Sequence, residues 1–216
     1  MPQEEVNAKL ELLVERIVPL YKTGKLKKSE EHYWAAKGTV NFSQPGKTDR
    51  GLFSVYLFNL VKVNRGEAVF QDAGVPHAYL EGQNIEIMAS SDNVLRGGLT
   101  TKHIDVQELL KHTRCEPTIP NILHGEQKGK ELVYKTPAPD FELSSFTLKK
   151  GEAASFTSST TEILLLVKGI VNVDDGKSSI ELKIGQPSGI IFAEDNVKLT
   201  AHEDALVFKA TVPFKG

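Results

Sequence analysis

Cysteine is almost missing from this sequence of 216 residues, which contains Cys115 and no other. A single cysteine excludes an intramolecular disulfide and a zinc cluster built on cysteines, and a free thiol is typical of a reducing compartment. Long apolar runs are also missing, since Val55–Val63 and Ile163–Val167 are interrupted or too short to span a bilayer. The acidic start Met1–Glu5 lacks the apolar region of a secretory signal. We therefore expect a cytoplasmic protein without a membrane segment.

An excess of either charge is missing too. The sequence has 26 Lys and Arg against 28 Asp and Glu, which gives a net charge of -2. Nucleic-acid binding favours a basic excess or a basic stripe, so we expect neither nucleic acid nor an anionic membrane surface as a partner. The 40% of hydrophobic and 25% of charged residues are ordinary for a soluble globular protein. At roughly 150 residues per domain, the length predicts one large domain or two small ones.

The first part of the sequence has helical periodicity. Apolar residues recur three or four positions apart, as on one face of a helix, at Val6, Leu10, Leu13, Val14, Ile17 and Leu20. Pro19 and then Gly24 are expected to end this helix. A second short helix is predicted over Ser29–Lys37, with Ser29 as its N-cap.

From Leu52 onward the pattern changes to short β-rich runs separated by turn residues. The first predicted strands are Leu52–Val63, Ala68–Gln71, His77–Leu80, Asn84–Ala89 and Val94–Leu99. A helix capped by Asp105 follows, with Val106, Leu109 and Leu110 as its buried face. A second series of strands is predicted over Phe141–Lys149, Ala153–Ser155, Glu162–Val173, Ser178–Ile184, Ser188–Ala193, Val197–Ala201 and Ala205–Val212. Strands this short, with turns about every 8–12 residues, predict a β-sandwich or barrel.

The densest group of polar residues lies between residues 73 and 100. Residues two apart on a strand share a face, so His77 and Tyr79 are predicted to point the same way, and Glu86 to point away from Ile85 and Ile87. Such groups could line one polar pocket, and an imidazole is a common zinc ligand. Taken singly, each also has a structural interpretation, such as a histidine satisfied near a turn or a half-exposed strand. Spacing alone leaves both interpretations open.

The order of the motifs is more specific than their spacing. Pro76-His77-Ala78-Tyr79 and Ser91-Asp92-Asn93-Val94-Leu95-Arg96 resemble the type I mannose-6-phosphate isomerases. The resemblance also covers Asp49–Ser54 and Gly66–Ala68 and extends, more loosely, from Ser159 to the C-terminus. It implies a mainly β protein, a cupin or jelly-roll β-sandwich that forms the C-terminal portion of a double cupin, with a short N-terminal helical segment.

The resemblance also implies an activity and the residues that carry it. Members of the family are zinc-dependent and interconvert mannose 6-phosphate and fructose 6-phosphate. Arg96 matches an arginine near the reacting carbons, and Glu86 and Asp92 match catalytic pocket positions, Asp92 with a suggested role in opening the sugar ring. Tyr79 and Lys102 match substrate-binding positions, with the lysine near the phosphate. Glu86 is chemically able to be the general base, but a supporting structural role is equally open.

Zinc is the implied cofactor, and His77 matches a histidine ligand of the family. A catalytic zinc needs about three protein ligands and one open position. The family supplies the others from a Gln-x-His pair and a glutamate, and this sequence contains no Gln-x-His pair. We therefore expect the zinc site of this chain to be incomplete.

The resemblance predicts a division of the chain into three parts. Residues 1–48 are expected to be a helical segment, residues 49–115 the C-terminal part of the catalytic cupin, and residues 116–216 a second, metal-free cupin. The expected partners are the sugar phosphate substrate, the missing N-terminal part of the enzyme and, through open sheet edges near residues 52–100, a second copy of the chain. The alternative is a non-catalytic cupin-like protein that binds a sugar or a partner.

Overall fold

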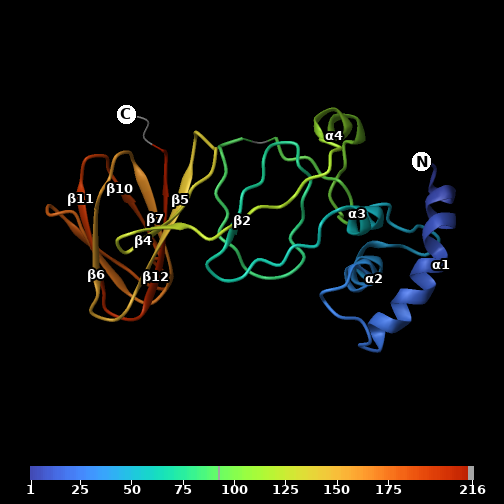
Figure 1. Ribbon diagram of the computed structural model, residues 1–216, viewed down its shortest axis with the longest axis horizontal. Helices are drawn as coiled ribbons and strands as arrows, with labels where there is room; N and C mark the ends of the chain where they lie inside the picture. Colours follow the sequence, from blue (N-terminus) through green and yellow to red (C-terminus); the bar gives the residue numbers. More distant parts are fainter. Residues whose placement is uncertain (92, 214–216) are drawn as a thin grey trace. The chain divides into compact units, whose positions relative to one another are not determined.

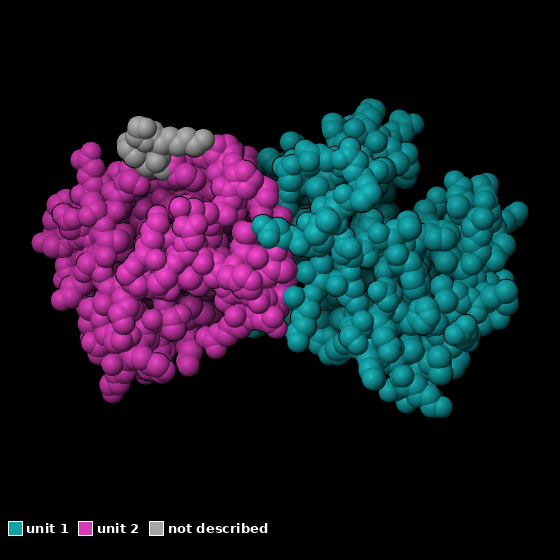
Figure 2. All heavy atoms as spheres, viewed as in Figure 1, with its two compact units in different colours: residues 1–62, 71–83, 91–121 teal, residues 63–70, 84–90, 122–216 magenta. Residues whose placement is uncertain are grey.

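The computed structural model describes residues 1–91 and 93–213. The described residues divide into two compact units, shown in different colours in Figure 2. The first unit holds residues 1–62, 71–83 and 91–121, and the second holds residues 63–70, 84–90 and the chain from residue 122 onward. Among the described residues, no helix has the length and apolar character needed to cross a membrane.

The first unit is built on helices, drawn in blue to green in Figure 1. They are α1 (Gln3–Lys22), α2 (Glu31–Phe42), α3 (Leu52–Leu57) and α4 (Val106–His112). The two predicted N-terminal helices are confirmed, although the second begins two residues later and ends five residues later than Ser29–Lys37, and its N-cap is Glu30 and not Ser29. Helix α1 packs against α2, and a core of buried apolar side chains lies between them, made of Val6, Leu10, Ile17, Ala35, Ala36 and Leu52.

Two predictions for this unit are wrong. Leu52–Val63, predicted as a strand, begins with the helix α3, which places Leu52 in the helical core. The predicted buried face of α4 is also wrong, because Val106 is 54% and Leu110 69% exposed. The predicted helix itself and its cap are confirmed, since Asp105 Oδ1 accepts a hydrogen bond of 3.0 Å from the Glu108 backbone N–H.

The three strands predicted around the polar motifs do not form either. Within the described residues, His77–Leu80, Asn84–Ala89 and Val94–Leu99 are irregular and mostly exposed. Ala68–Gln71 is shortened to β1 (Ala68–Val69), which pairs with β2 (Ile122–Leu123). A strand needs a neighbour to satisfy its backbone N–H and C=O groups, and the described chain offers the other three segments none.

The second unit is dominated by two antiparallel sheets, and here the predicted β-sandwich is confirmed (Figure 1). The six-stranded sheet has the order β10-β7-β12-β5-β4-β3 and the four-stranded sheet the order β6-β11-β8-β9. Their strands are β3 (Glu126–Lys128), β4 (Glu131–Tyr134), β5 (Glu142–Leu148), β6 (Ala153–Thr157), β7 (Glu162–Lys168), β8 (Val171–Asp174), β9 (Ser179–Leu182), β10 (Ser188–Ile191), β11 (Asn196–Ala201) and β12 (Ala205–Thr211).

Alternating side chains explain why these segments form a sandwich. On β7 the buried residues Glu162, Leu164 and Leu166 alternate with more exposed ones, as expected for strands with one face on a core. The inward residues of both sheets form one apolar cluster that includes Phe146 and Leu199. The chain is thus mainly β with a helical N-terminal segment, as predicted.

A group of polar side chains on four neighbouring strands of the six-stranded sheet interrupts this core. Lys209 on β12, of which 7% is exposed, lies 2.9 Å from Glu131 Oε1 on β4 and 3.6 Å from Glu162 Oε1 on β7. Ser144 on β5 donates a hydrogen bond to Glu131. The Lys209 ammonium also lies 4.5 Å from the ring centroid of Phe156, which β6 contributes from the facing sheet. The sandwich therefore places two carboxylates, a buried one on Glu162 and a partly buried one on Glu131, beside one buried ammonium group.

Candidate functional site

The predicted site residues lie on the exposed, irregular segment between residues 71 and 104. His77, Tyr79, Arg96 and Lys102 belong to the first unit, and Glu86 belongs to the second. All five are exposed. Asp92 lies outside the described residues. These assignments remain predictions, and the contacts of each residue show what holds it in place.

His77 and Tyr79 form an aromatic pair. Their ring centroids are 5.9 Å apart and their planes meet at 68°, an edge-to-face arrangement. The two residues belong to no strand of the described chain, so this contact forms within an irregular segment. The Nδ1 atom of His77 lies 3.1 Å from the Val75 carbonyl oxygen. In the tautomer that donates this hydrogen bond, Nε2 keeps its lone pair and could accept a metal ion.

The segment before His77 is tied to the end of α4. Arg114 Nη1 lies 2.7 Å from Asp72 Oδ2, and the Arg114 backbone N–H donates to the Gly74 carbonyl oxygen at 2.8 Å. The Arg114 guanidinium holds the pKa of the Asp72 carboxyl below its usual range. Gly74 has a φ of +78°, and a Cβ there would come within 2.7 Å of the His112 carbonyl oxygen. This close approach requires glycine.

Glu86 lies in a stretch of the second unit in which half-buried and exposed residues alternate. It is exposed, whereas its neighbours Ile85 and Ile87 are half-buried. The predicted alternation of sides therefore persists in the burial of these residues even though no strand forms among them.

Arg96 and Lys102 lie on either side of a turn that is anchored to the helices. Leu99, in this turn, packs against the helical core and has a φ of +47°, which is uncommon for a residue other than glycine. Its backbone N–H and that of Gly51 both point at Asp49 Oδ1, at 3.4 and 2.7 Å. Sequence reasoning missed Asp49 as a residue near the site. The available signal was its place in the Asp49–Ser54 motif.

The described residues do not by themselves fit a catalytic zinc. Within residues 1–91 and 93–213, no group of three His, Cys, Asp or Glu side chains is close enough together to hold a metal ion. His77 is one potential ligand, and a catalytic zinc needs about three.

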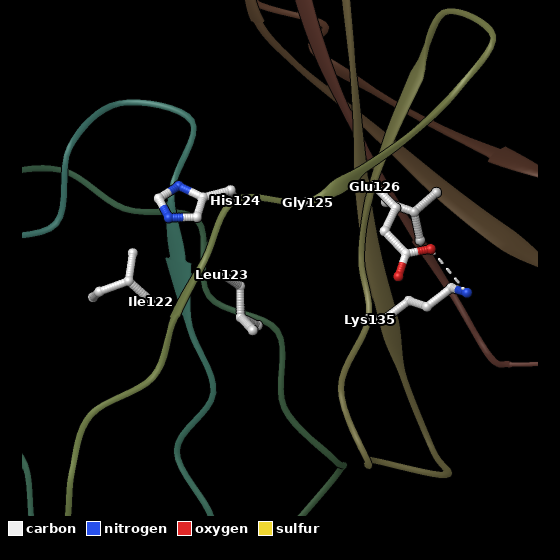
Figure 3. Close-up of a pocket in the computed structure, with 7 residues that line it drawn as sticks. Ile122, Leu123, His124, Gly125, Glu126 and Lys135 are labelled. Atoms are coloured by element: carbon white, nitrogen blue, oxygen red, sulfur yellow. Dashed lines mark ion pairs between the residues drawn. The ribbon is translucent and has the colours of Figure 1, made fainter.

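The second unit contains a pocket that is lined by residues other than the described site residues. Figure 3 shows it between the β1–β2 pair and the start of the six-stranded sheet. Lys135 Nζ lies 2.9 Å from Glu126 Oε2 in it, and this bond raises the pKa of Lys135. His124 lies on the opposite side of the pocket in Figure 3, and its Nδ1 is 3.7 Å from Glu67 Oε1. None of the five predicted site residues that the structure describes is among those that line it.

Comparison with known proteins gives relatives of one kind. No family model matches the sequence. Mannose-6-phosphate isomerase of Escherichia coli K12 is 40% identical over 156 residues, which are 71% of this chain and 40% of that protein. Mannose-6-phosphate isomerase of Mus musculus is 33% identical over 216 residues, 95% of this chain and 50% of that protein. The chain therefore spans about half the length of these curated relatives, or less.

Solved structures agree with the sequence relatives. A phosphomannose isomerase variant from Salmonella typhimurium superposes with a TM-score of 0.68 and 29% identity, over 97% of this chain and 58% of that one. The Salmonella typhimurium enzyme bound to its substrate fructose 6-phosphate and zinc gives a TM-score of 0.60 and 25% identity over the same shares. The chain is thus a homologue of the mannose-6-phosphate isomerases that corresponds to about half of their length.

Proposed function

We propose that this chain supplies one part of a zinc-dependent aldose–ketose isomerase that interconverts mannose 6-phosphate and fructose 6-phosphate. The observation that carries the proposal is the similarity to enzymes of this name over most of the chain. The Pro76–Tyr79 and Ser91–Arg96 motifs supply the residues. The exposed thiol of Cys115 fits a cytoplasmic location, which we propose as well.

The chemistry of the reaction suits the proposed residues. Moving a carbonyl between C1 and C2 takes a proton from one carbon and delivers it to the next, through an enediolate with negative charge on oxygen. The fixed cation of Arg96 would stabilise this charge, and the ammonium of Lys102 would bind the phosphate. Tyr79 would contact the sugar and Asp92 would assist ring opening. A general base must reach the carbon-bound proton, and Glu86 is our candidate.

The zinc ion would take its ligands from two different stretches of protein. We propose His77 as one zinc ligand and assign the remaining ligands to the part of the relatives that this sequence does not match. In this view residues 49–115 belong to the catalytic cupin and residues 116–216 to a second cupin without metal. The chain matches 40 to 50% of these relatives, so their unmatched part could supply the remaining ligands.

A second candidate function is sugar-phosphate binding without catalysis. It is favoured by the lack of a three-donor metal group among the described residues. Arg96 and Lys102 would then bind the phosphosugar without completing a reaction.

Calorimetric titration of the chain with fructose 6-phosphate tests the binding step shared by both functions. We expect Lys102→Ala to weaken binding at least about tenfold, because a charged hydrogen bond to phosphate contributes roughly 1.5–3 kcal/mol. The matched control is Lys198→Ala, which removes an equally exposed lysine from β11. Equal affinities of the wild type and Lys102→Ala would contradict the proposed role of Lys102.

A further inference from the structure

We propose that Asp49 is a positioning residue that sets the conformation of the segment carrying Arg96 and Lys102. The inference rests on the proposed function, in which these two side chains bind the substrate. Between residues 93 and 103 the chain is exposed except at Gly98, Leu99 and Thr100. The contacts of these three residues therefore determine where their neighbours on either side lie.

Hydrogen bonds join this turn to the one before α3. Asp49 Oδ1 accepts a bond of 2.7 Å from the Gly51 N–H and a weaker one of 3.4 Å from the Leu99 N–H. The backbone N–H of Asp49 in turn donates to Ser43 Oγ at 3.1 Å, just after α2. One carboxylate oxygen thus connects the helical core with the turn between Arg96 and Lys102.

Two glycines allow the backbones to approach each other. A Cβ on Gly98 would lie 2.8 Å from the Gly51 Cα, and a Cβ on Gly51 would lie 2.8 Å from the Leu99 nitrogen. Gly98 also has a φ of +146°, a conformation that favours glycine. The backbones can therefore touch only because neither position carries a side chain.

The side chain of Leu99 also holds the turn against the helices. It packs against the helical core, where a Cβ on Gly38 would come within 3.3 Å of Leu99 Cδ2. A leucine at positive φ persists only when its surroundings hold it there. Beyond the turn, the Lys102 backbone N–H donates to Thr100 Oγ1 at 3.1 Å, which extends the ordered contacts to the lysine itself. Loss of the Asp49 carboxylate should release this arrangement and misplace the binding groups.

The test compares Asp49→Ala with Asp49→Asn, which keeps an acceptor oxygen. The control is Asp175→Ala, because Asp175 also accepts two backbone N–H groups in a turn, from Lys177 and Ser178. The readouts are amide hydrogen exchange at Leu99 and the Kd for fructose 6-phosphate. We expect Asp49→Ala to exchange at least tenfold faster and to bind at least fivefold more weakly. Asp49→Asn and Asp175→Ala should stay within twofold of the wild type.

Every other outcome of this test bears either on the positioning role of Asp49 or on the proposed function. Unchanged exchange in Asp49→Ala, or faster exchange with an unchanged Kd, overturns the positioning role. If Asp49→Ala loses its helical circular dichroism, Gly98→Ala replaces it, since its Cβ would collide with Gly51 and should produce the same losses. A wild-type chain that does not bind fructose 6-phosphate contradicts the proposed function, and exchange at Leu99 then decides the role of Asp49 separately.

Discussion

At the scale of single residues, Lys209 and its two glutamates make the β-sandwich sensitive to pH. One ammonium can balance one carboxylate, and Lys209 lies closer to Glu131 (2.9 Å) than to Glu162 (3.6 Å). Glu162 is 2% exposed, and its Oε2 has no hydrogen-bond partner among the described residues. Burial raises the pKa of Glu162, and the nearby Lys209 opposes this shift only in part. Glu162 therefore holds a proton to higher pH in the folded state than in the unfolded state.

The raised pKa of Glu162 determines how the stability of the folded protein changes with pH. A raised folded-state pKa stabilises the protein fully below the unfolded pKa, about 4.3 for a glutamate, and this stabilisation is lost as pH rises through the folded pKa. Glu162→Gln cannot ionise, so its stability should lack this decline. In urea unfolding followed from about pH 3, below the unfolded pKa, to about pH 8, the variant should gain about 1.4 kcal/mol on the wild type for each unit by which the folded-state pKa is raised. Parallel pH profiles of the two proteins would contradict the prediction.

Glu131→Gln is the contrasting substitution. It removes the closer partner of Lys209 and leaves the buried ammonium with Glu162 at 3.6 Å. Removing one member of a buried pair costs about 3–5 kcal/mol when no partner remains. Because Glu162 can still balance the ammonium, the loss at pH 7 should be smaller than this but at least about 1 kcal/mol. A loss below about 1 kcal/mol would show that the Lys209–Glu131 contact does not hold this end of the sheet.

At the scale of elements, turns set the ends of the strands in the sandwich. Gly169, between β7 and β8, has a φ of +87°, and a Cβ there would lie 2.6 Å from the Asp204 carbonyl oxygen. Gly176, between β8 and β9, has a φ of +81° but open space around it. Gly176→Ala should cost about 1 kcal/mol from the positive φ alone. Gly169→Ala should cost at least about 1 kcal/mol more, because the backbone must also shift. Equal melting temperatures of the two variants would contradict this account.

The elements also show how far the sequence predicts the structure. Most strands from β5 to β12 follow from alternation and turns because each finds its neighbours within the same stretch of chain. The exception is the predicted strand Glu162–Val173, which is divided into β7 and β8 in different sheets. The segments around His77, Glu86 and Arg96 have a similar local pattern, but sheet formation there depends on partner strands that no local pattern reveals. The site residues were predicted from motif order. Asp49 was missed because its contact with Leu99 joins residues 50 positions apart.

At the scale of the whole molecule, the exposed middle segment predicts self-association. It exposes large apolar side chains within a stretch whose predicted strands do not form, among them Leu57, Val61, Tyr79, Met88 and Val94. Exposed apolar surface and unpaired backbone favour association. Light scattering of the isolated chain at increasing concentration should show an average mass above one chain. A single monomeric mass throughout would contradict this prediction.

We propose that this chain holds one part of an isomerase site, whose zinc ligands are completed by another stretch of protein. The most direct test measures bound zinc and mannose 6-phosphate isomerisation by the purified chain. Both are measured with and without a polypeptide covering the part of the relatives that the chain does not match. We predict neither stoichiometric zinc nor isomerisation for the chain alone, and both after the addition, with their loss in His77→Ala. One equivalent of zinc and isomerisation by the chain alone would contradict the account.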